Sequence, residues 1–278
     1  MKVIRIVGPS DSGTTTLVER LVDRLADRGR VGTIRHLDCE PSLDVTGTDT
    51  ARHREAGATE TYGIADDGGW VKSDADQTLT AALDELAVSC DYAVVEGYSG
   101  ATQALPTVAL GGADADDPLA AAPTADGIEA EAILDALEAT DAYESLASLV
   151  ARVKRSETAD RAGAIATFTG RVREKDSPTD EPTEYLEFER YDEVAAEKMR
   201  AIREQLMARS GVYDVRLHHR TGVVAAGEDI VFVVVLAGHR REAFETVEDG
   251  IDRLKAEVPL FKKEVTVSGE FWAHQHDH

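Results

Sequence analysis

The sequence is poor in cysteine and has no long hydrophobic run. Its 278 residues include two cysteines, Cys39 and Cys90, which form no Cys-x-x-Cys pair. We therefore expect two reduced thiols, as is usual in the cytoplasm, rather than a disulfide. No apolar run approaches the roughly 18 to 20 residues that span a bilayer, and the chain begins with a strand pattern instead of a charged-then-apolar signal segment. These absences predict a cytoplasmic protein without a membrane partner.

Positive charge is also scarce. The chain has 30 lysine and arginine residues against 53 aspartate and glutamate residues, which gives a formal net charge of −23. Such a surface repels the phosphate backbone of nucleic acids and anionic lipid, so neither is expected as a partner. An acid excess with few lysines resembles the surfaces of halophile proteins, on which carboxylates keep the surface hydrated at high salt.

The few lysines are concentrated in one place. Of eight in the chain, Lys255, Lys262 and Lys263 fall within nine positions, and His239 and Arg240 precede them. A chain that otherwise uses arginine for positive charge is expected to need ammonium groups here for anion binding or catalysis. The alternative is that these charges are solvated, as most lysines are.

A segment of small and turn-forming residues divides the chain. Residues 111–127 contain two prolines and four aspartates among glycines and alanines, a composition that predicts a loop rather than a packed strand or helix. A short helix pattern follows, and we place the domain boundary near residue 140. The prediction is therefore two domains, residues 1–140 and residues 141–278, each long enough to bury its own core.

The two halves have different patterns of secondary structure. In the first half, apolar runs that do not alternate in polarity indicate strands covered on both faces, hence an α/β fold with a mostly parallel sheet. The expected strands are 3–7, 31–34, 91–97 and 107–110, with a helix at 15–28. The second half predicts an α+β domain, with strands at 164–171, 184–190, 212–220 and 229–236 and helices at 143–153, 192–209 and 241–257. The last helix is expected to bury Phe244, Val247, Ile251 and Leu254.

A glycine-rich loop follows the first strand and opens the first helix. It matches a Walker A loop, G-x-x-x-x-G-K-[ST], except that Thr14 stands at the lysine position. Glycines let backbone N–H groups converge on a phosphate, and the helix N-terminus favours negative charge. We expect nucleotide or phosphate binding without efficient hydrolysis, because lysine normally neutralises the terminal phosphates; the alternative is an ordinary strand–turn–helix connection. The predicted nucleotide-binding residues are Gly8, Ser10, Asp11, Ser12, Gly13, Thr14, Thr15 and Thr16.

Further motifs follow this loop: Ile34-Arg35-His36-Leu37-Asp38, Asp44, the segment 49–58, and Val94-Val95-Glu96-Gly97-Tyr98. Together they make residues 1–138 resemble the GTP-binding adapter protein of molybdopterin-guanine dinucleotide biosynthesis, a small P-loop domain. The resemblance implies GTP and Mg²⁺ as ligands, with Thr15 and Glu96 on the metal side and Asp38 and Asp44 as further carboxylates. It also implies the molybdenum cofactor nucleotidyltransferase as a partner.

In the second half, the basic residues stand at the ends of predicted elements. His239 and Arg240 join a strand to a helix, where backbone N–H groups help to hold an anion. Lys255 lies on the edge of the buried helix face, so we expect a packed stem and a partly desolvated ammonium group. Pro259 ends the helix and turns the chain, so that one of the two following lysines approaches Lys255.

Several motifs of this half occur in order: Thr-Gly-Arg-Val-Arg (169–173), His-Arg-x-Gly (219–222), Gly-His-Arg-x-x-Ala-Phe (238–244) and Leu-Lys-x-x-x-Pro-x-x-Lys-Lys-Glu (254–264). They make residues 142–273 similar to the catalytic large subunit of molybdopterin synthase. The resemblance implies a sulfurtransferase that converts cyclic pyranopterin monophosphate to molybdopterin and requires no cofactor for sulfur transfer. It implies Lys255 and Lys262 as catalytic residues and, as substrate-binding residues, Arg171, Arg173, His239, Arg240, Lys263 and Glu264.

The second resemblance also implies partners. The sulfur donor would be a small ubiquitin-like subunit with a thiocarboxylated Gly-Gly C-terminus. The large subunits would form a homodimer, in which residues of the neighbouring subunit complete each site. Two alternatives stay open: a non-catalytic docking module for a ubiquitin-like protein coupled to a nucleotide sensor, and a P-loop phosphotransferase, against which Thr14 argues. Three alternating histidines, His274, His276 and His278, are expected to form a frayed tail.

Overall fold

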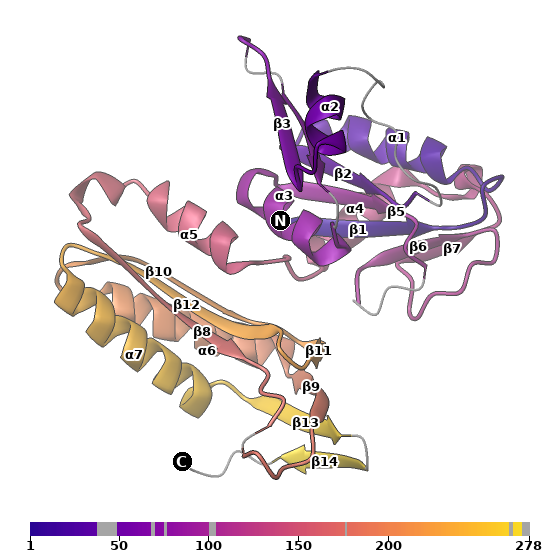
Figure 1. Cartoon of the computed structure of the whole chain (residues 1–278). Helices are drawn as coiled ribbons and strands as arrows, with labels where there is room; N and C mark the ends of the chain where they lie inside the picture. Colours follow the sequence, from indigo (N-terminus) through magenta and orange to yellow (C-terminus); the bar gives the residue numbers. More distant parts are fainter. Residues whose placement is uncertain are drawn as a thin grey trace. The chain divides into compact units, whose positions relative to one another are not determined.

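The computed structural model describes residues 1–37, 49–67, 70–74, 77–99, 104–175, 177–266 and 269–273. The chain forms two compact units that divide between Tyr143 and Glu144 (Figure 1). Cys39, Asp38, Asp44 and the three terminal histidines lie outside the described residues.

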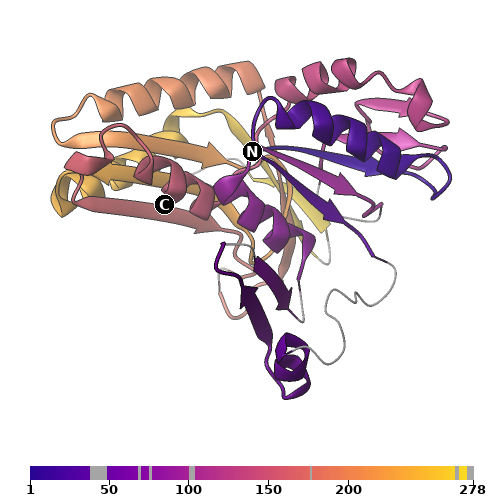
Figure 2. The ribbon, with the colours of Figure 1, turned by 90° about the horizontal axis from the view of Figure 1, so that it is seen from above.

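The N-terminal unit is built on a parallel five-stranded sheet. Its strand order is β2-β5-β1-β6-β7, with β1 Lys2–Val7, β2 Val31–Arg35, β5 Tyr92–Glu96, β6 Thr107–Leu110 and β7 Ala120–Ala122. Helices α1 (Thr14–Ala26) and α4 (Ala130–Ala139) cover one face, and α3 (Leu79–Ser89) covers the other (Figure 2). The central strands are buried on both faces, because helices lie on each side, so the predicted α/β class is confirmed.

The prediction of a loop over residues 111–127 is wrong for two short segments. Ala120–Ala122 forms β7, which extends the parallel sheet beside β6, and Ala125–Gly127 forms a short 3-10 helix, η1. The small side chains of Ala120 and Ala122 pack against the core, while Pro118 and Pro123 flank the strand instead of interrupting its ladder. A short edge strand needs few hydrogen bonds, so alanine's low strand propensity does not prevent it.

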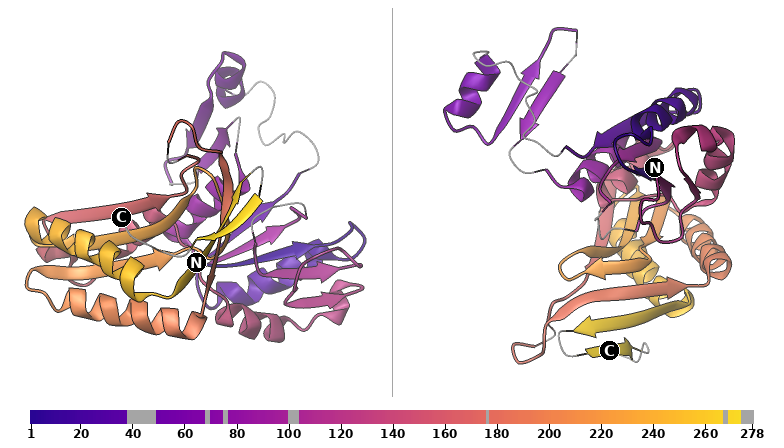
Figure 3. Two further views of the ribbon diagram at one scale, coloured as in Figure 1. Left: turned by 90° about the horizontal axis from the view of Figure 1, so that it is seen from below. Right: turned by 90° about the vertical axis from the view of Figure 1, so that its right-hand side faces the viewer.

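A smaller sheet lies within the same unit. Strands β3 (Glu60–Ile64) and β4 (Trp70–Asp74) form an antiparallel pair, and α2 (Asp49–Glu55) packs against β3 (Figure 3). The sequence reading did not anticipate this hairpin.

The C-terminal unit contains an antiparallel three-stranded sheet in the order β10-β12-β8. Its central strand, β12 (Asp229–Ala237), has an unbroken apolar run because it is covered on both faces. Phe232, Val234 and Leu236 pack against α5 (Leu146–Lys154). The alternate residues pack against α6 (Asp192–Met207) and α7 (Arg240–Glu257) (Figure 1). The flanking strands are β8 Ala164–Arg171 and β10 Val212–His219, and the 3-10 turn η2 is Ala159–Arg161.

A second antiparallel sheet completes this unit, with strand order β11-β9-β13-β14. Its strands are β9 Thr183–Arg190, β11 Gly222–Ala225, β13 Leu260–Thr266 and β14 Gly269–Ala273. The predicted α+β class is therefore confirmed. Among the helices in the described part of the chain, none combines the length and apolar character needed to cross a bilayer.

Helix α7 departs from its predicted packing at one residue. Val247, Ile251 and Leu254 are buried as expected, but Phe244 is 65% exposed. Phe244 precedes Val247 by three positions and Ile251 by seven, so helical spacing alone places it on the apolar face. Ala243 and Val247 occupy the core side of this part of the helix, so Phe244 is left on the solvent side.

The packing of α6 against the sheet generates a stability prediction. Leu206 is fully buried in the C-terminal core, so Leu206→Ala is expected to lower the free energy of unfolding by about 2–5 kcal/mol through the cavity it leaves. Val194→Ala is the matched control, because Val194 lies on the same helix and is 47% exposed. Urea denaturation followed by circular dichroism measures both; equal losses in the two variants would contradict this core.

Candidate active site

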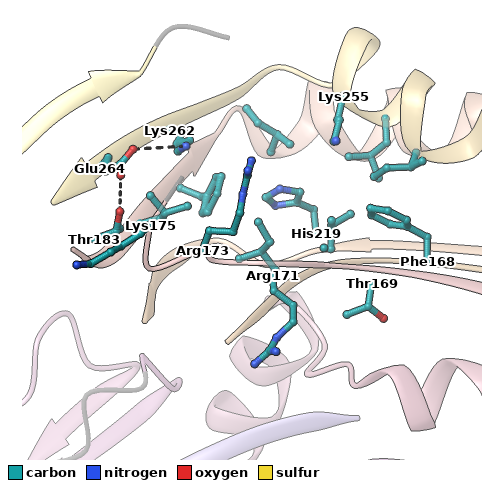
Figure 4. A pocket seen from close by; sticks show the side chains of 18 of the residues that line it. Phe168, Thr169, Arg171, Arg173, Lys175, Thr183, His219, Lys255, Lys262 and Glu264 are labelled. Carbon is teal, nitrogen blue, oxygen red and sulfur yellow. Dashed lines mark hydrogen bonds and ion pairs between the residues drawn. The ribbon is translucent and has the colours of Figure 1, made fainter. Parts of the chain in front are cut away.

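A cavity of about 760 Å³ opens between the two sheets of the C-terminal unit. Its walls come from the end of β8, the start of β12, the last turns of α7, and strands β9 and β13 (Figure 4). The loop after β8 closes one side with Arg173, Lys175, Asp180 and Glu181. Five lining side chains are lysine or arginine and three are carboxylates, so the cavity is cationic in a chain whose net charge is −23.

Lys255 enters this cavity from the last turn of α7. Its ammonium nitrogen lies 5.9 Å from the centre of the Phe168 ring, a cation–π distance, and the carboxyl end of the helix favours a positive charge. Glu257 is engaged elsewhere: the hydrogen bond from Arg253, 2.6 Å long, lowers the pKa of Glu257 below the ordinary carboxyl value. The expected desolvation is wrong for the single chain, because Lys255 is exposed.

Lys262 reaches the same cavity from β13. The helix ends at Glu257, and Pro259 precedes the strand, which starts at Leu260. Alternate residues of β13 then line the cavity, namely Leu260, Lys262, Glu264 and Thr266. The turn therefore places ammonium groups from two different elements in one cavity, as the sequence predicts.

Glu264 contacts Lys262 and Thr183 at the cavity edge of β13. It lies 3.7 Å from the Lys262 nitrogen, and the Thr183 hydroxyl donates a hydrogen bond to it (Figure 4). The neighbouring Lys263 is absent from the cavity lining; its ammonium lies 3.6 Å from Glu187, directly opposite it on β9. The two adjacent lysines thus serve opposite faces of one strand.

The two predicted arginines behave differently. Arg173 extends its guanidinium into the cavity between Lys255 and Lys262 (Figure 4). The Arg171 side chain also borders the cavity, but its guanidinium points away, to Asp229 at 3.2 Å and to the Gly227 carbonyl (Figure 4). Arg173 is therefore the better placed of the two to bind an anion inside.

His239 and Arg240 do not join this cavity within one chain. Arg240 begins α7 and Lys255 lies fifteen residues later, which corresponds to about 22 Å along the helix axis at ~1.5 Å per residue. Both residues are exposed. The expected convergence of this pair with the lysines is therefore wrong for the isolated subunit.

Two basic lining residues were not predicted as site residues. His219 ends β10 and is 6% exposed, and Lys175 follows β8 in the closing loop. His219 is part of the His-Arg-x-Gly motif, and the scarcity of lysine that singled out Lys255 applies equally to Lys175. These signals were available in the sequence, but the placement of the residues depends on how distant strands pair.

The glycine-rich loop of the N-terminal unit is compact. Gly13 caps α1 with φ 84°, a left-handed conformation that favours glycine. The Ser12 hydroxyl donates to the Pro9 carbonyl at 2.7 Å. A Cβ on Gly8 would lie 2.6 Å from the Ser12 oxygen, so the loop has no room for a side chain there. The predicted nucleotide-binding residues accordingly form one strand–turn–helix connection.

Thr14, at the lysine position of the Walker A pattern, takes part in a hydrogen-bond network with Thr15 and Glu96. Thr14 and Thr15 both donate to one oxygen of Glu96, at 3.1 and 2.7 Å. Arg35 lies 3.9 Å from the other oxygen of the same carboxylate. This arrangement brings together the two residues predicted on the metal side, Thr15 and Glu96. It offers Mg²⁺ a carboxylate and a hydroxyl, with waters to complete the shell.

In the described part of the chain, no group of three or more His, Cys, Asp or Glu side chains is placed to hold a metal ion. The C-terminal cavity presents amines, guanidinium groups, an imidazole and carboxylates. Such a set can bind a phosphate monoester through charge-assisted hydrogen bonds. It can also stabilise an oxyanion that develops on a substrate carbonyl.

Two family models match successive parts of the chain. "Molybdopterin guanine dinucleotide synthesis protein B" matches residues 3–121, and "MoaE protein" matches residues 139–257. The "Probable molybdopterin synthase" of Haloferax volcanii is 50% identical over 274 residues, which cover 99% of each chain.

Shorter relatives match the second half. The "Molybdopterin synthase catalytic subunit" of Pyrococcus abyssi is 42% identical over 123 residues, 44% of this chain and 79% of that protein. The crystal structure of molybdopterin synthase from Staphylococcus aureus is 32% identical, covers 42% of this chain and 83% of its own, and has a TM-score of 0.39.

Proposed function

This chain belongs to the molybdopterin synthase catalytic-subunit family and carries a domain of the molybdopterin guanine dinucleotide synthesis protein B family in front of its MoaE domain, and we propose that its C-terminal cavity transfers sulfur to cyclic pyranopterin monophosphate. The observation that carries the proposal is the meeting of Lys255 and Lys262 in one cavity with Arg173 and Glu264. The sulfur donor is a small ubiquitin-like protein whose Gly-Gly C-terminus ends in a thiocarboxylate.

The cationic lining fits the charges of both reactants. The pterin precursor carries a phosphate, and the donor tail ends in an anionic sulfur. Arg173 offers a forked set of donors that suits a phosphate oxygen pair. The ammonium groups of Lys255 and Lys262 are compact charges that suit a developing oxyanion. Because the rest of the chain is acidic, the cavity is the favoured place for an anionic ligand.

The proposed chemistry has two steps on each carbon that receives sulfur. The thiocarboxylate sulfur attacks the substrate carbon, and the displaced oxygen leaves with a proton, so that an acyl-linked intermediate forms. Water then cleaves the acyl–sulfur bond, which leaves sulfur on the pterin and a carboxylate on the donor. Lys255 and Lys262 stabilise the negative charge that develops in these steps, and Glu264 orients Lys262 through their contact of 3.7 Å.

A second copy of the chain completes the site in this proposal. His239 and Arg240 are exposed at the start of α7, about 22 Å from Lys255 along one helix. A homodimer through the C-terminal domain would let this pair reach the cavity of the neighbouring subunit and bind the phosphate there. In a two-fold dimer each contact occurs twice, so both cavities would be completed at once.

The N-terminal unit is proposed to bind a guanine nucleotide without hydrolysing it efficiently. Its loop offers backbone N–H groups and a helix N-terminus to phosphates, and Thr15 with Glu96 would hold Mg²⁺. Thr14 offers a hydroxyl where a lysine would neutralise the terminal phosphates. A nucleotidyltransferase of the molybdenum cofactor is the proposed partner of this unit.

We expect Lys255→Ala and Lys262→Ala each to abolish molybdopterin formation, because the developing charge loses its ammonium partner. The assay supplies purified precursor and thiocarboxylated donor and follows the product by mass spectrometry. Lys198→Ala, an exposed lysine on α6, is the control for loss of one positive charge. Near-wild-type turnover in either cavity variant would refute the catalytic role. A chain that binds the donor but never consumes it would instead be a docking module.

Mixing inactive variants tests whether a second copy contributes. Lys262→Ala and Arg240→Ala are each expected to be inactive alone. After subunit exchange, random pairing should restore about one quarter of wild-type activity, because half of the dimers then contain one intact site out of two. Absence of any recovery, with exchange verified by mass spectrometry, would place both residues in the same site or outside the reaction.

The nucleotide proposal is tested by calorimetric titration with GTP and Mg²⁺. Wild-type chain is expected to bind weakly, and Thr14→Lys to bind roughly tenfold more tightly or better, since a charge-assisted hydrogen bond contributes about 1.5–3 kcal/mol. Gln77→Lys adds the same charge at an exposed position outside the loop and should leave the affinity unchanged. No measurable binding to wild type and to Thr14→Lys would refute nucleotide binding by this loop.

A further inference from the structure

We propose that Thr183 is a positioning residue for sulfur transfer: it acts through Glu264 to keep the Lys262 ammonium group near the carboxylate but available to the substrate. This assignment rests on the sulfur-transfer function proposed above. The Thr183 hydroxyl donates a hydrogen bond to one carboxylate oxygen of Glu264, and the other oxygen lies 3.7 Å from the Lys262 nitrogen (Figure 4). All three side chains line the same cavity, so this series of contacts ends at a proposed catalytic amine.

A bulge in strand β9 turns Thr183 toward the cavity. Between the pairs made by Tyr185 and Thr183, β9 advances by two residues while β13 advances by one, so Glu184 is an extra residue in the ladder. Leu186 lines the cavity, and strict alternation along β9 would place Glu184 on the same face. Instead Thr183 lines the cavity and is 6% exposed, whereas Glu184 is exposed. The bulge therefore re-aims the side chain at this point, as bulges beside functional sites often do.

The Thr183 hydroxyl governs how closely Glu264 approaches the lysine. A separation of 3.7 Å makes the Lys262–Glu264 contact an ion pair rather than a hydrogen bond. Without the Thr183 donor, a partly buried carboxylate oxygen loses its partner, and the Lys262 ammonium group can replace that donor. A shorter contact through both oxygens would hold the ammonium group against Glu264 and offset its charge. Less of that charge would then reach an oxyanion that develops on the substrate.

Two substitutions separate the hydroxyl of Thr183 from its packing. Thr183→Val keeps the shape of the side chain and removes the donor, whereas Thr183→Ser keeps the donor and removes a methyl group. We expect Thr183→Val to lower kcat about 5- to 20-fold, the effect of one hydrogen bond to a charged group, and Thr183→Ser to stay within about twofold. KM for the precursor should change less than kcat, because the ammonium group acts on charge that develops in the transition state.

A purely structural role predicts the opposite order, because the lost methyl group leaves a cavity at a buried position. Thermal unfolding of each variant gives the folded fraction at the assay temperature, and kcat is expressed per folded chain. Thr246→Val is the matched control, since Thr246 is a buried threonine of α7 in the same unit and is absent from the cavity lining; its kcat should equal that of wild type. Lower kcat in Thr183→Ser than in Thr183→Val would overturn the proposal.

A double-mutant cycle with Glu264→Gln tests whether the effect of Thr183 passes through the carboxylate. If it does, Thr183→Val lowers kcat when Glu264 is present and has little further effect when Glu264→Gln has already removed the charge. Equal fold losses in the two backgrounds would show that Thr183 acts independently of Glu264, and would overturn the proposal. If Glu264→Gln alone gives no measurable turnover, the order of Thr183→Val and Thr183→Ser decides.

The same assay separates this inference from the function on which it rests. The purified full chain is supplied with precursor and thiocarboxylated donor, and the product is followed by mass spectrometry. If wild type forms no product, the sulfur-transfer function fails and the role of Thr183 fails with it. If wild type forms product and Thr183→Val is equally active, the positioning role alone is refuted. If Thr183→Val does not fold, Thr183→Ser decides: a loss of kcat above about fivefold per folded chain overturns the assignment, because the donor to Glu264 is still present.

Discussion

The turn between α7 and β13 is the constraint on which the candidate site depends. Helix α7 ends at Glu257, Pro259 cannot continue it, and the chain enters β13 at Leu260. Lys255 on the last helical turn and Lys262 on the strand thereby reach one cavity. The apolar strand β12 supports this geometry, because Val231, Val233 and Val235 of that strand belong to the core on which α7 packs.

The cavity differs in charge from the rest of the chain. The surface is dominated by carboxylates, whereas the cavity wall gathers lysine and arginine from four separate elements. Anions are therefore disfavoured over the acidic surface and favoured at this cavity. Three of the five cations are also held locally: Lys255 by the Phe168 ring and the helix end, Lys262 by Glu264, and Arg171 by Asp229. Contacts within the chain thus position these cationic side chains at the cavity.

The sequence predicts elements that depend on neighbouring residues in the chain. It does not predict features that depend on contacts between segments far apart in the sequence. The continuous apolar run of β12 predicts a central strand, and Pro259 predicts the end of α7. By contrast, Ala120–Ala122 becomes a strand because β6 offers it an edge. Phe244 lies exposed because Ala243 and Val247 occupy the core side of its part of the helix. The separation of Arg240 from Lys255 follows from the predicted length of the helix alone. Lys175 and His219 required knowledge of which strands meet.

The pairing of Lys263 with Glu187 bears on the register of β13 against β9. Adjacent residues of a strand face opposite sides, so β13 presents one lysine inward and fastens the next to β9 on the outer face. Sliding β13 by one position against β9 would exchange the two, withdraw Glu264 and turn Phe261 inward. The Lys263–Glu187 ion pair therefore favours the strand register that places Lys262 and Glu264 on the cavity side. The irregularity between Val265 and Thr266 falls just beyond this stretch, so the regular pairing that positions Lys262 ends before it.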